Sequence, residues 1–202
     1  MSDTPQGTPA SSSGAEPDLT PQAQAAIEAT RAWVDRAVIG LNLCPFAKAV
    51  QLGGRIRYAV SEARDADALV GDLAREASAL MAADPERVET TLLIHPHVMD
   101  DFLDYNDFLD IADAAIEALG FEGELQVASF HPRYQFEGTA VDDISNYSNR
   151  SPYPTLHLLR EESVERGVEL MPDTDRIYER NIETLERLGQ AGWQALWEEK
   201  KD

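Results

Sequence analysis

The chain has 202 residues, 43% of them hydrophobic, which suits a single domain with a sizeable core. Its formal net charge of −20 argues against nucleic acid or an anionic membrane as a partner, because both require a basic face. Only three of the 17 basic residues are lysine, an acidic, lysine-poor balance typical of proteins from salt-rich cytoplasm, so we expect added salt to stabilise the fold.

The N-terminal residues 1–20 are mainly Ser, Thr, Pro, Gly and Ala, a composition that predicts a disordered tail. A helix is expected to begin at Thr20, since Thr-Pro supplies a capping hydroxyl and a proline for the first turn, and to end or bend at Gly40. Alternation of apolar residues and helical periodicity then predict the order βαβαβ, a fourth strand and closing helices. The strands are expected at 55–60, 89–97, 124–131 and 154–161, and the helices at 65–83, 105–119, 161–168 and 173–188.

This order predicts a single α/β domain over residues 21–190, with a three- or four-stranded, mostly parallel sheet and flanking helices. Strands joined by helical crossovers should be parallel, whereas the fourth strand should be antiparallel and lie at an edge. Residues 191–202 are interpreted as a C-terminal helical extension. Its Trp193 and Trp197 share one helical face, which either docks on the domain or meets a partner protein.

Cys44 is the only cysteine, so no intrachain disulfide can form and an oxidising compartment is not implied. The N-terminus lacks the basic and apolar regions of a signal peptide, and no apolar run approaches the roughly 20 residues that span a bilayer. We therefore expect a cytoplasmic protein without a membrane partner.

Residues 131–162 are predicted to form the functional site, because they concentrate hydrogen-bonding side chains in a long connection. In this hypothesis the substrate is an anionic small molecule, a carboxylate or a phosphate, and His131 is the general acid or base. The predicted substrate-binding residues are Arg133, Tyr134, Asn146, Asn149, Arg150 and His157. The alternative is that the arginines form ion pairs with Glu137, Asp142, Asp143 or Glu161.

A metal site is a second hypothesis, in which a divalent transition metal would be bound by His95, His97, His131 and Cys44, with Asp100, Asp101, Asp142 and Asp143 as further ligands. Two predicted strands end in the same dipeptide, at His95 and His131, so these histidines are expected side by side if their strands are neighbours. Cys44 is also a candidate nucleophile at a helix start, although a single cysteine is more often a small buried apolar residue.

The segments LNLCPFA, LLIHPH, FHPRYQFEG and SNYSNRSPYPTLHLLRE resemble the bacterial family called domain of unknown function 1415. The resemblance extends from Thr30 to Gly189 and is most specific in SNRSPYPTLHLLRE. It implies a stand-alone small protein of unassigned activity and carries over no catalytic roles.

The favoured function is therefore a small enzyme that acts on an anionic molecule, with Cys44 as nucleophile or metal ligand if it faces the same site. The two alternatives are a non-catalytic metal-binding or metal-handling protein and a protein-interaction module that uses the polar segment and the tryptophans.

Overall fold

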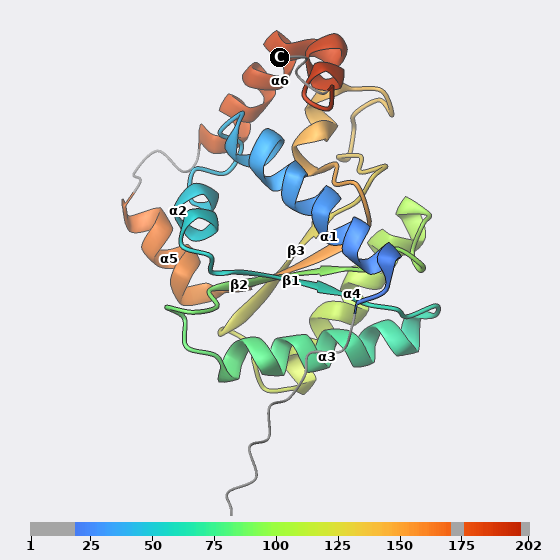
Figure 1. Ribbon diagram of the computed structural model, residues 1–202, viewed down its shortest axis with the longest axis vertical. Helices are drawn as coiled ribbons and strands as arrows, with labels where there is room; N and C mark the ends of the chain where they lie inside the picture. The colour runs from blue at the N-terminus through green and yellow to red at the C-terminus, as the bar shows by residue number, and fades with distance from the viewer. Residues whose placement is uncertain (1–18, 171–175, 199–202) are drawn as a thin grey trace, which may run out of the picture.

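The computed structural model describes residues 19–170 and 176–198, which form a sheet covered by helices on both faces (Figure 1). The helices are α1 (Pro21–Trp33), η1 (Val34–Ile39, a π-helix), α2 (Ala47–Leu52), α3 (Ala66–Ala82), α4 (Phe102–Ala118), η2 (Ile144–Asn149, a 3-10 helix), α5 (Glu161–Leu170) and α6 (Ile177–Ala195). The strands are β1 (Ile56–Val60), β2 (Thr90–Ile94), β3 (Leu125–Phe130) and β4 (Thr155–Arg160). None of the described helices is both long and apolar enough to cross a membrane.

Capping side chains set several helix starts that the sequence predicts. The Thr20 hydroxyl accepts a hydrogen bond from the amide of Ala23, and the Asp65 carboxylate accepts one from Ala68. Helix α4 begins three residues earlier than predicted, because Asp101 caps it by accepting hydrogen bonds from Leu103 and Asp104. Helix α2 begins at Ala47, close to the helix start considered at Cys44, whereas the π-helix and the 3-10 helix η2 were not predicted.

The sheet has the order β1-β2-β4-β3. Strands β1 and β2 are parallel, but β4 is antiparallel to both of its neighbours, β2 and β3. The prediction of a mostly parallel sheet is therefore wrong, although the α/β class and the antiparallel direction of the fourth strand are confirmed. The long connection from β3 lets the chain return between β2 and β3, so β4 lies inside the sheet and not at the predicted edge.

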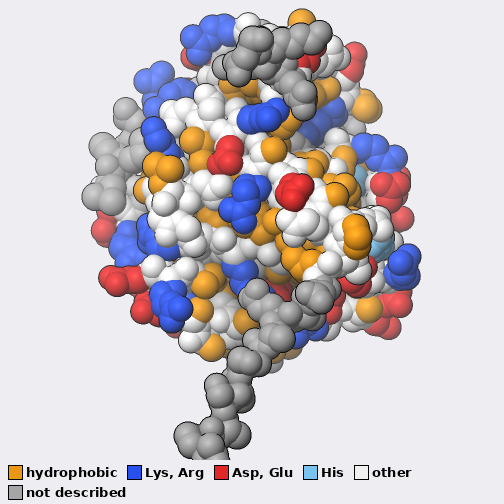
Figure 2. Space-filling model, viewed as in Figure 1, with side chains coloured by type: hydrophobic (Ala, Val, Ile, Leu, Met, Phe, Trp, Pro, Cys, Tyr) orange, Lys and Arg blue, Asp and Glu red, His pale blue; other side chains and the backbone are white. Residues whose placement is uncertain are grey.

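Each face of the sheet has its own apolar core. Helices α3 and α4 cover one face, where the buried residues include Leu69, Leu73, Leu80, Phe108, Leu156 and Leu158. Helix α1, η1 and the end of α6 contribute to the other core, which contains Trp33, Val34, Leu43, Leu92, Leu185 and Trp193. Figure 1 shows α1 and α3 on opposite sides of the strands, with α2 and α5 next to each other. Over the face that α1 covers, basic and acidic side chains are interspersed (Figure 2).

The C-terminal tryptophans belong to the folded unit. Helix α6 is interrupted at Gly189, whose φ of 62° is not helical, and a second helical stretch follows this residue to Ala195. Trp193 is 8% exposed and packs edge-on against Tyr147 of η2, with 5.0 Å between ring centroids. Docking on the domain is therefore the arrangement of Trp193, while Trp197 remains 38% exposed. The predicted tail, residues 1–20, lies almost entirely outside the described residues, as does the start of the helix predicted at 173–188.

Candidate functional site

The polar segment, defined here as residues 131–154, is held together by its own side chains. The Asn146 side chain is fully buried; its Oδ1 accepts hydrogen bonds from the Phe136 amide (2.9 Å) and the Thr139 hydroxyl (2.8 Å), and its Nδ2 donates to the Ala140 carbonyl (2.9 Å). Asn149 donates to the Ser129 carbonyl at 3.3 Å. These asparagines satisfy backbone groups that have no strand partner, which is what a long loop requires.

The arginines of the polar segment also have partners within the protein. Arg150 donates to the carbonyls of Tyr134 and Val141, and its guanidinium lies 4.4 Å from the centre of the Tyr147 ring. Arg133 donates to the Asp100 carbonyl and lies 3.7 Å from the carboxylates of Asp100 and Asp101. The arginines therefore bind carbonyls and acids, although the acids differ from those considered from the sequence.

His95 and His131 both contact one aromatic ring. β4 separates the strands that precede them, so the expectation that they follow neighbouring strands is wrong. Both instead pack against Tyr105 of α4, with ring centroids 5.7 Å and 5.1 Å away. The Tyr105 hydroxyl donates to the Thr155 carbonyl and accepts from the Phe130 amide, which fixes the ring that both histidines contact.

Both ring nitrogens of His131 are occupied. Nε2 donates to the Met99 carbonyl at 3.1 Å, and Nδ1 accepts from the Arg133 amide at 3.0 Å. Burial lowers the pKa of His131, so its imidazole is neutral at neutral pH. His95 donates through Nδ1 to the Val98 carbonyl at 3.1 Å, and burial lowers its pKa to about 4.

The predicted metal ligands are not brought together. His97 pairs with Glu62 at 3.1 Å, and Cys44 lies in a cavity described below. Within residues 19–170 and 176–198, no three His, Cys, Asp or Glu side chains are grouped so as to hold a metal ion. The described residues thus offer no centre that fits the predicted transition metal.

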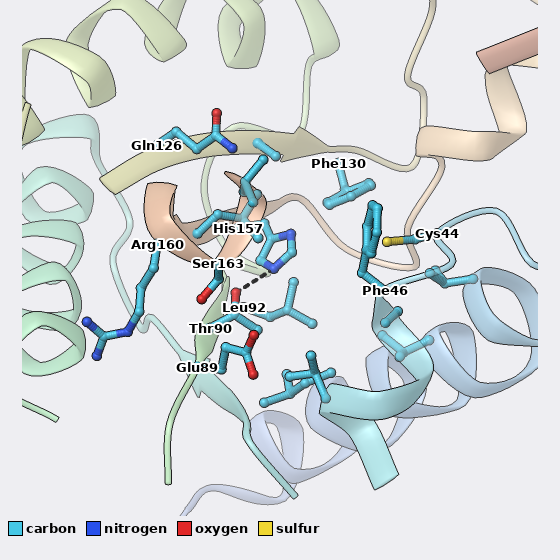
Figure 3. A pocket seen from close by; sticks show the side chains of 18 of the residues that line it. Cys44, Phe46, Glu89, Thr90, Leu92, Gln126, Phe130, His157, Arg160 and Ser163 are labelled. Atoms are coloured by element: carbon cyan, nitrogen blue, oxygen red, sulfur yellow. Dashed lines mark hydrogen bonds between the residues drawn. The ribbon is translucent and has the colours of Figure 1, made fainter. Parts of the chain in front are cut away.

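A cavity of about 320 Å³, here called the sheet cavity, lies on the face of the sheet that α1 covers (Figure 3). Its walls come from β1–β4, the end of α1, η1, α2 and the start of α5, and most of them are apolar. Two of the predicted site residues, Cys44 and His157, lie here. The polar and thiol side chains of the lining belong to Cys44, Glu89, Thr90, Gln126, His157, Arg160 and Ser163.

Small side chains leave the space open. Across the sheet, Tyr58, Leu92, His157 and Ala128 are aligned in one row of paired positions, so the methyl group of Ala128 lies next to the imidazole of His157. On the opposite wall Ala47 begins α2. The hollow therefore arises where the sheet presents alanine and histidine instead of two large apolar residues.

The helical wall is set by close backbone packing. A Cβ at Gly40 would lie 2.2 Å from the Arg36 carbonyl oxygen, so only glycine fits at the end of the π-helix that carries Val34 and Val38. A Cβ at Gly167 of α5 would lie 3.1 Å from the Phe46 ring. Glycine there lets α5 approach Phe46, which lines the cavity beside Cys44 (Figure 3).

The charged groups at the cavity are engaged elsewhere. Glu89 pairs with Arg55, and the Arg160 guanidinium donates to the carbonyls of Leu80 and Ala83 at the end of α3. Figure 3 shows the Arg160 guanidinium directed away from the cavity, with only its stem on the wall. Burial raises the pKa of the Cys44 thiol, and the Phe46 and Ala47 amides oppose this rise only partly. The thiol is thus protonated and uncharged at neutral pH.

Sequence reasoning missed Thr90, Phe46, Ala128 and Phe130 as site residues. The signal that was available is His157 itself: in Thr155-Leu156-His157-Leu158-Leu159 it occupies an inward position between apolar neighbours. A polar residue at such a position either has a buried partner or faces a cavity, and His157 does both.

Comparison with protein families matches residues 25–195 to the family described as "Protein of unknown function (DUF1415)". The chain belongs to this family. The match covers most of the chain, including every element that lines the sheet cavity, and it confirms the resemblance seen in the sequence. Comparisons with curated proteins and with solved structures give no match.

Proposed function

We propose that this member of the family binds a small, uncharged, mainly apolar molecule in the sheet cavity. The observation that carries the proposal is a partly enclosed cavity of about 320 Å³ with apolar walls. This volume lies at the lower end of the range for ligand sites, and it is roughly twice that of an apolar cavity of about 150 Å³ that accepts benzene. A molecule of about two or three aromatic rings would fill it.

The charge distribution supports an uncharged ligand. Glu89 and Arg160 have protein partners, so an ionic ligand would lose its hydration without gaining a counter-charge. Arg133 and Arg150, the anion-binding residues expected from the sequence, are paired within the polar segment and do not line the sheet cavity. An anionic substrate is therefore a weaker proposal than a neutral ligand.

The protonation states favour binding over acid–base or nucleophilic catalysis. Burial lowers the pKa of His157 to about 4 and raises that of Cys44, so at neutral pH the cavity holds a neutral imidazole and a thiol. An imidazole with so low a pKa is a weak base, and a thiol is a poor nucleophile compared with a thiolate. Turnover of a bound molecule would be the result that restores the enzyme hypothesis.

The test uses two fluorophores that share one ring system. N-phenyl-1-naphthylamine is neutral, and 1-anilinonaphthalene-8-sulfonate carries an added sulfonate. Titration of the full chain should give saturable fluorescence enhancement with the neutral probe and at least about tenfold weaker binding of the sulfonate. The matched variant is Ala128→Leu, which fills the cavity beside His157.

This variant should lose most of the affinity for the neutral probe. Equal affinity for the neutral probe in Ala128→Leu and wild type would place the binding elsewhere and refute the proposal. Preferential binding of the sulfonate would instead support the anionic substrate expected from the sequence.

A further inference from the structure

The sheet cavity contains a hydrogen-bond arrangement that fixes one protonation form of His157. The Thr90 hydroxyl lies 2.6 Å from the Leu158 carbonyl oxygen and 2.7 Å from Nε2 of His157. A carbonyl oxygen can only accept, so the single hydroxyl proton of Thr90 is given to Leu158. His157 must then donate its Nε2 proton to the Thr90 oxygen, and its Nδ1 carries a lone pair.

Nδ1 of His157 has no hydrogen-bond partner among the described residues. Figure 3 shows one imidazole nitrogen bonded to Thr90 and the other directed toward the side of the cavity where Phe46 and Phe130 lie. Leu92 and Ala128 flank the ring along the sheet and offer no polar group. The cavity thus presents a hydrogen-bond acceptor of fixed direction on an apolar floor.

The walls near this acceptor are aromatic. The Phe130 and His157 ring centroids are 5.9 Å apart, and Trp33 contacts Phe130 edge-on at 5.0 Å. Phe46 completes the aromatic lining on the helical side. Such surroundings favour a flat molecule that can contact ring faces and edges.

We propose that His157 makes the sheet cavity selective for flat, uncharged aromatic molecules that carry one N–H or O–H donor, which Nδ1 accepts. This inference rests on the proposed function, because it assumes that the cavity takes up a small neutral ligand. Thr90 is the positioning residue, since its bond to Leu158 holds His157 in the form that accepts. The low pKa of His157 agrees with this role, because an imidazolium would donate at both nitrogens.

The test compares two bicyclic probes of nearly the same shape. Indole has an N–H donor, and indene has a CH₂ group in its place. Calorimetric titration of the full chain should give roughly two- to tenfold tighter binding of indole, which is the effect of one neutral hydrogen bond. In His157→Phe, which keeps a ring but removes the acceptor, the two probes should bind equally.

A second variant tests the role of Thr90. Thr90→Val keeps the side-chain shape but removes the hydroxyl, so His157 is free to exchange protons between its nitrogens. The preference for indole over indene should shrink. Nitrogen-15 NMR of the imidazole should report a proton on Nε2 alone in wild type and a mixture of the two forms in Thr90→Val.

The outcomes separate the inference from the proposed function. Equal binding of indole and indene to wild type, or an Nδ1 proton in the wild-type spectrum, would overturn donor selectivity and leave the apolar cavity as a binding site. Failure of both probes and of the neutral fluorophore to bind would overturn the proposed function and the inference together. These wild-type measurements decide the matter even if a variant does not fold.

Discussion

The polar segment and the sheet cavity differ in how their polar atoms are satisfied. In the polar segment, the buried Asn146 makes three hydrogen bonds and Arg150 binds two carbonyls. In the cavity, by contrast, Nδ1 of His157 has no described partner. A dense group of polar side chains can thus be the means by which a long loop satisfies its backbone. An unpaired polar atom in an apolar hollow is the stronger sign of a binding site.

The largest expected effect is on pH dependence, because each region has a nearby histidine whose pKa is lowered by desolvation. The pKa values of His95 and His157 are lowered to about 4 by burial, against about 6.5 in the unfolded chain. Between these values the unfolded state binds more protons. The stability is therefore fully present above about pH 6.5 and is lost as the pH falls toward 4, by up to about 3 kcal/mol for each histidine and about 6 kcal/mol for the two together.

Urea unfolding of wild type, His95→Phe and His157→Phe between pH 4.5 and 7.5 measures this effect. Subtracting each variant's profile from that of wild type removes the contribution of the 37 acidic residues, which all three proteins share. In each variant, the free energy of unfolding should lack the part of the pH dependence that the replaced histidine contributes. Parallel profiles for all three proteins would contradict a lowered histidine pKa in both regions.

A smaller effect is expected from the asparagines of the polar segment. Asn146→Ala removes three hydrogen bonds from a buried site and should lower the free energy of unfolding by about 3 kcal/mol. Asn149→Ala, the matched control, removes one long bond to Ser129 and one bond from Ser148, and should cost under about 1 kcal/mol. Chemical denaturation gives both values. Equal losses would mean that Asn146 does not hold the segment together.

The smallest expected effect comes from comparing an Ala→Leu substitution beside the sheet cavity with one in the filled core on the other face of the sheet. Ala112 of α4 is fully buried in the core on the α3 and α4 side, so Ala112→Leu should destabilise the protein by about 1–3 kcal/mol. Ala128→Leu enlarges a residue that borders the sheet cavity and should change stability by less than about 1 kcal/mol. Thermal unfolding measures the stability of both variants. A larger loss of stability for Ala128→Leu than for Ala112→Leu would argue that the space beside Ala128 is already filled.

Much of the local structure follows from short-range patterns. The cap at Thr20, alternation of apolar residues in the strands and helical periodicity predict most elements to within a few residues. The position of β4 was predictable only in part. Its side chains Leu156 and Leu158 face one core and Leu159 faces the cavity, a pattern of apolar residues on both faces that indicates an inner strand.

The candidate site was harder to predict, because residue type does not tell where a hydrogen bond goes. His157 and Cys44 were named from the sequence, but as parts of an anion or metal site. Thr90 precedes His157 by 67 positions, and pairing of β2 with β4 brings their side chains within 2.7 Å. Nothing in the sequence around either residue indicates that the two side chains come this close.

The sequence by itself determined the α/β class, the order of the strands and longer helices along the chain, the family and the density of polar groups in residues 131–154, because these depend on local pattern and composition. The tertiary structure alone decided the order of the strands, the partners that occupy the predicted site residues and the hollow beside His157. These features result from contacts between segments distant in the chain, where packing and hydrogen-bond satisfaction are settled only when the whole fold has formed.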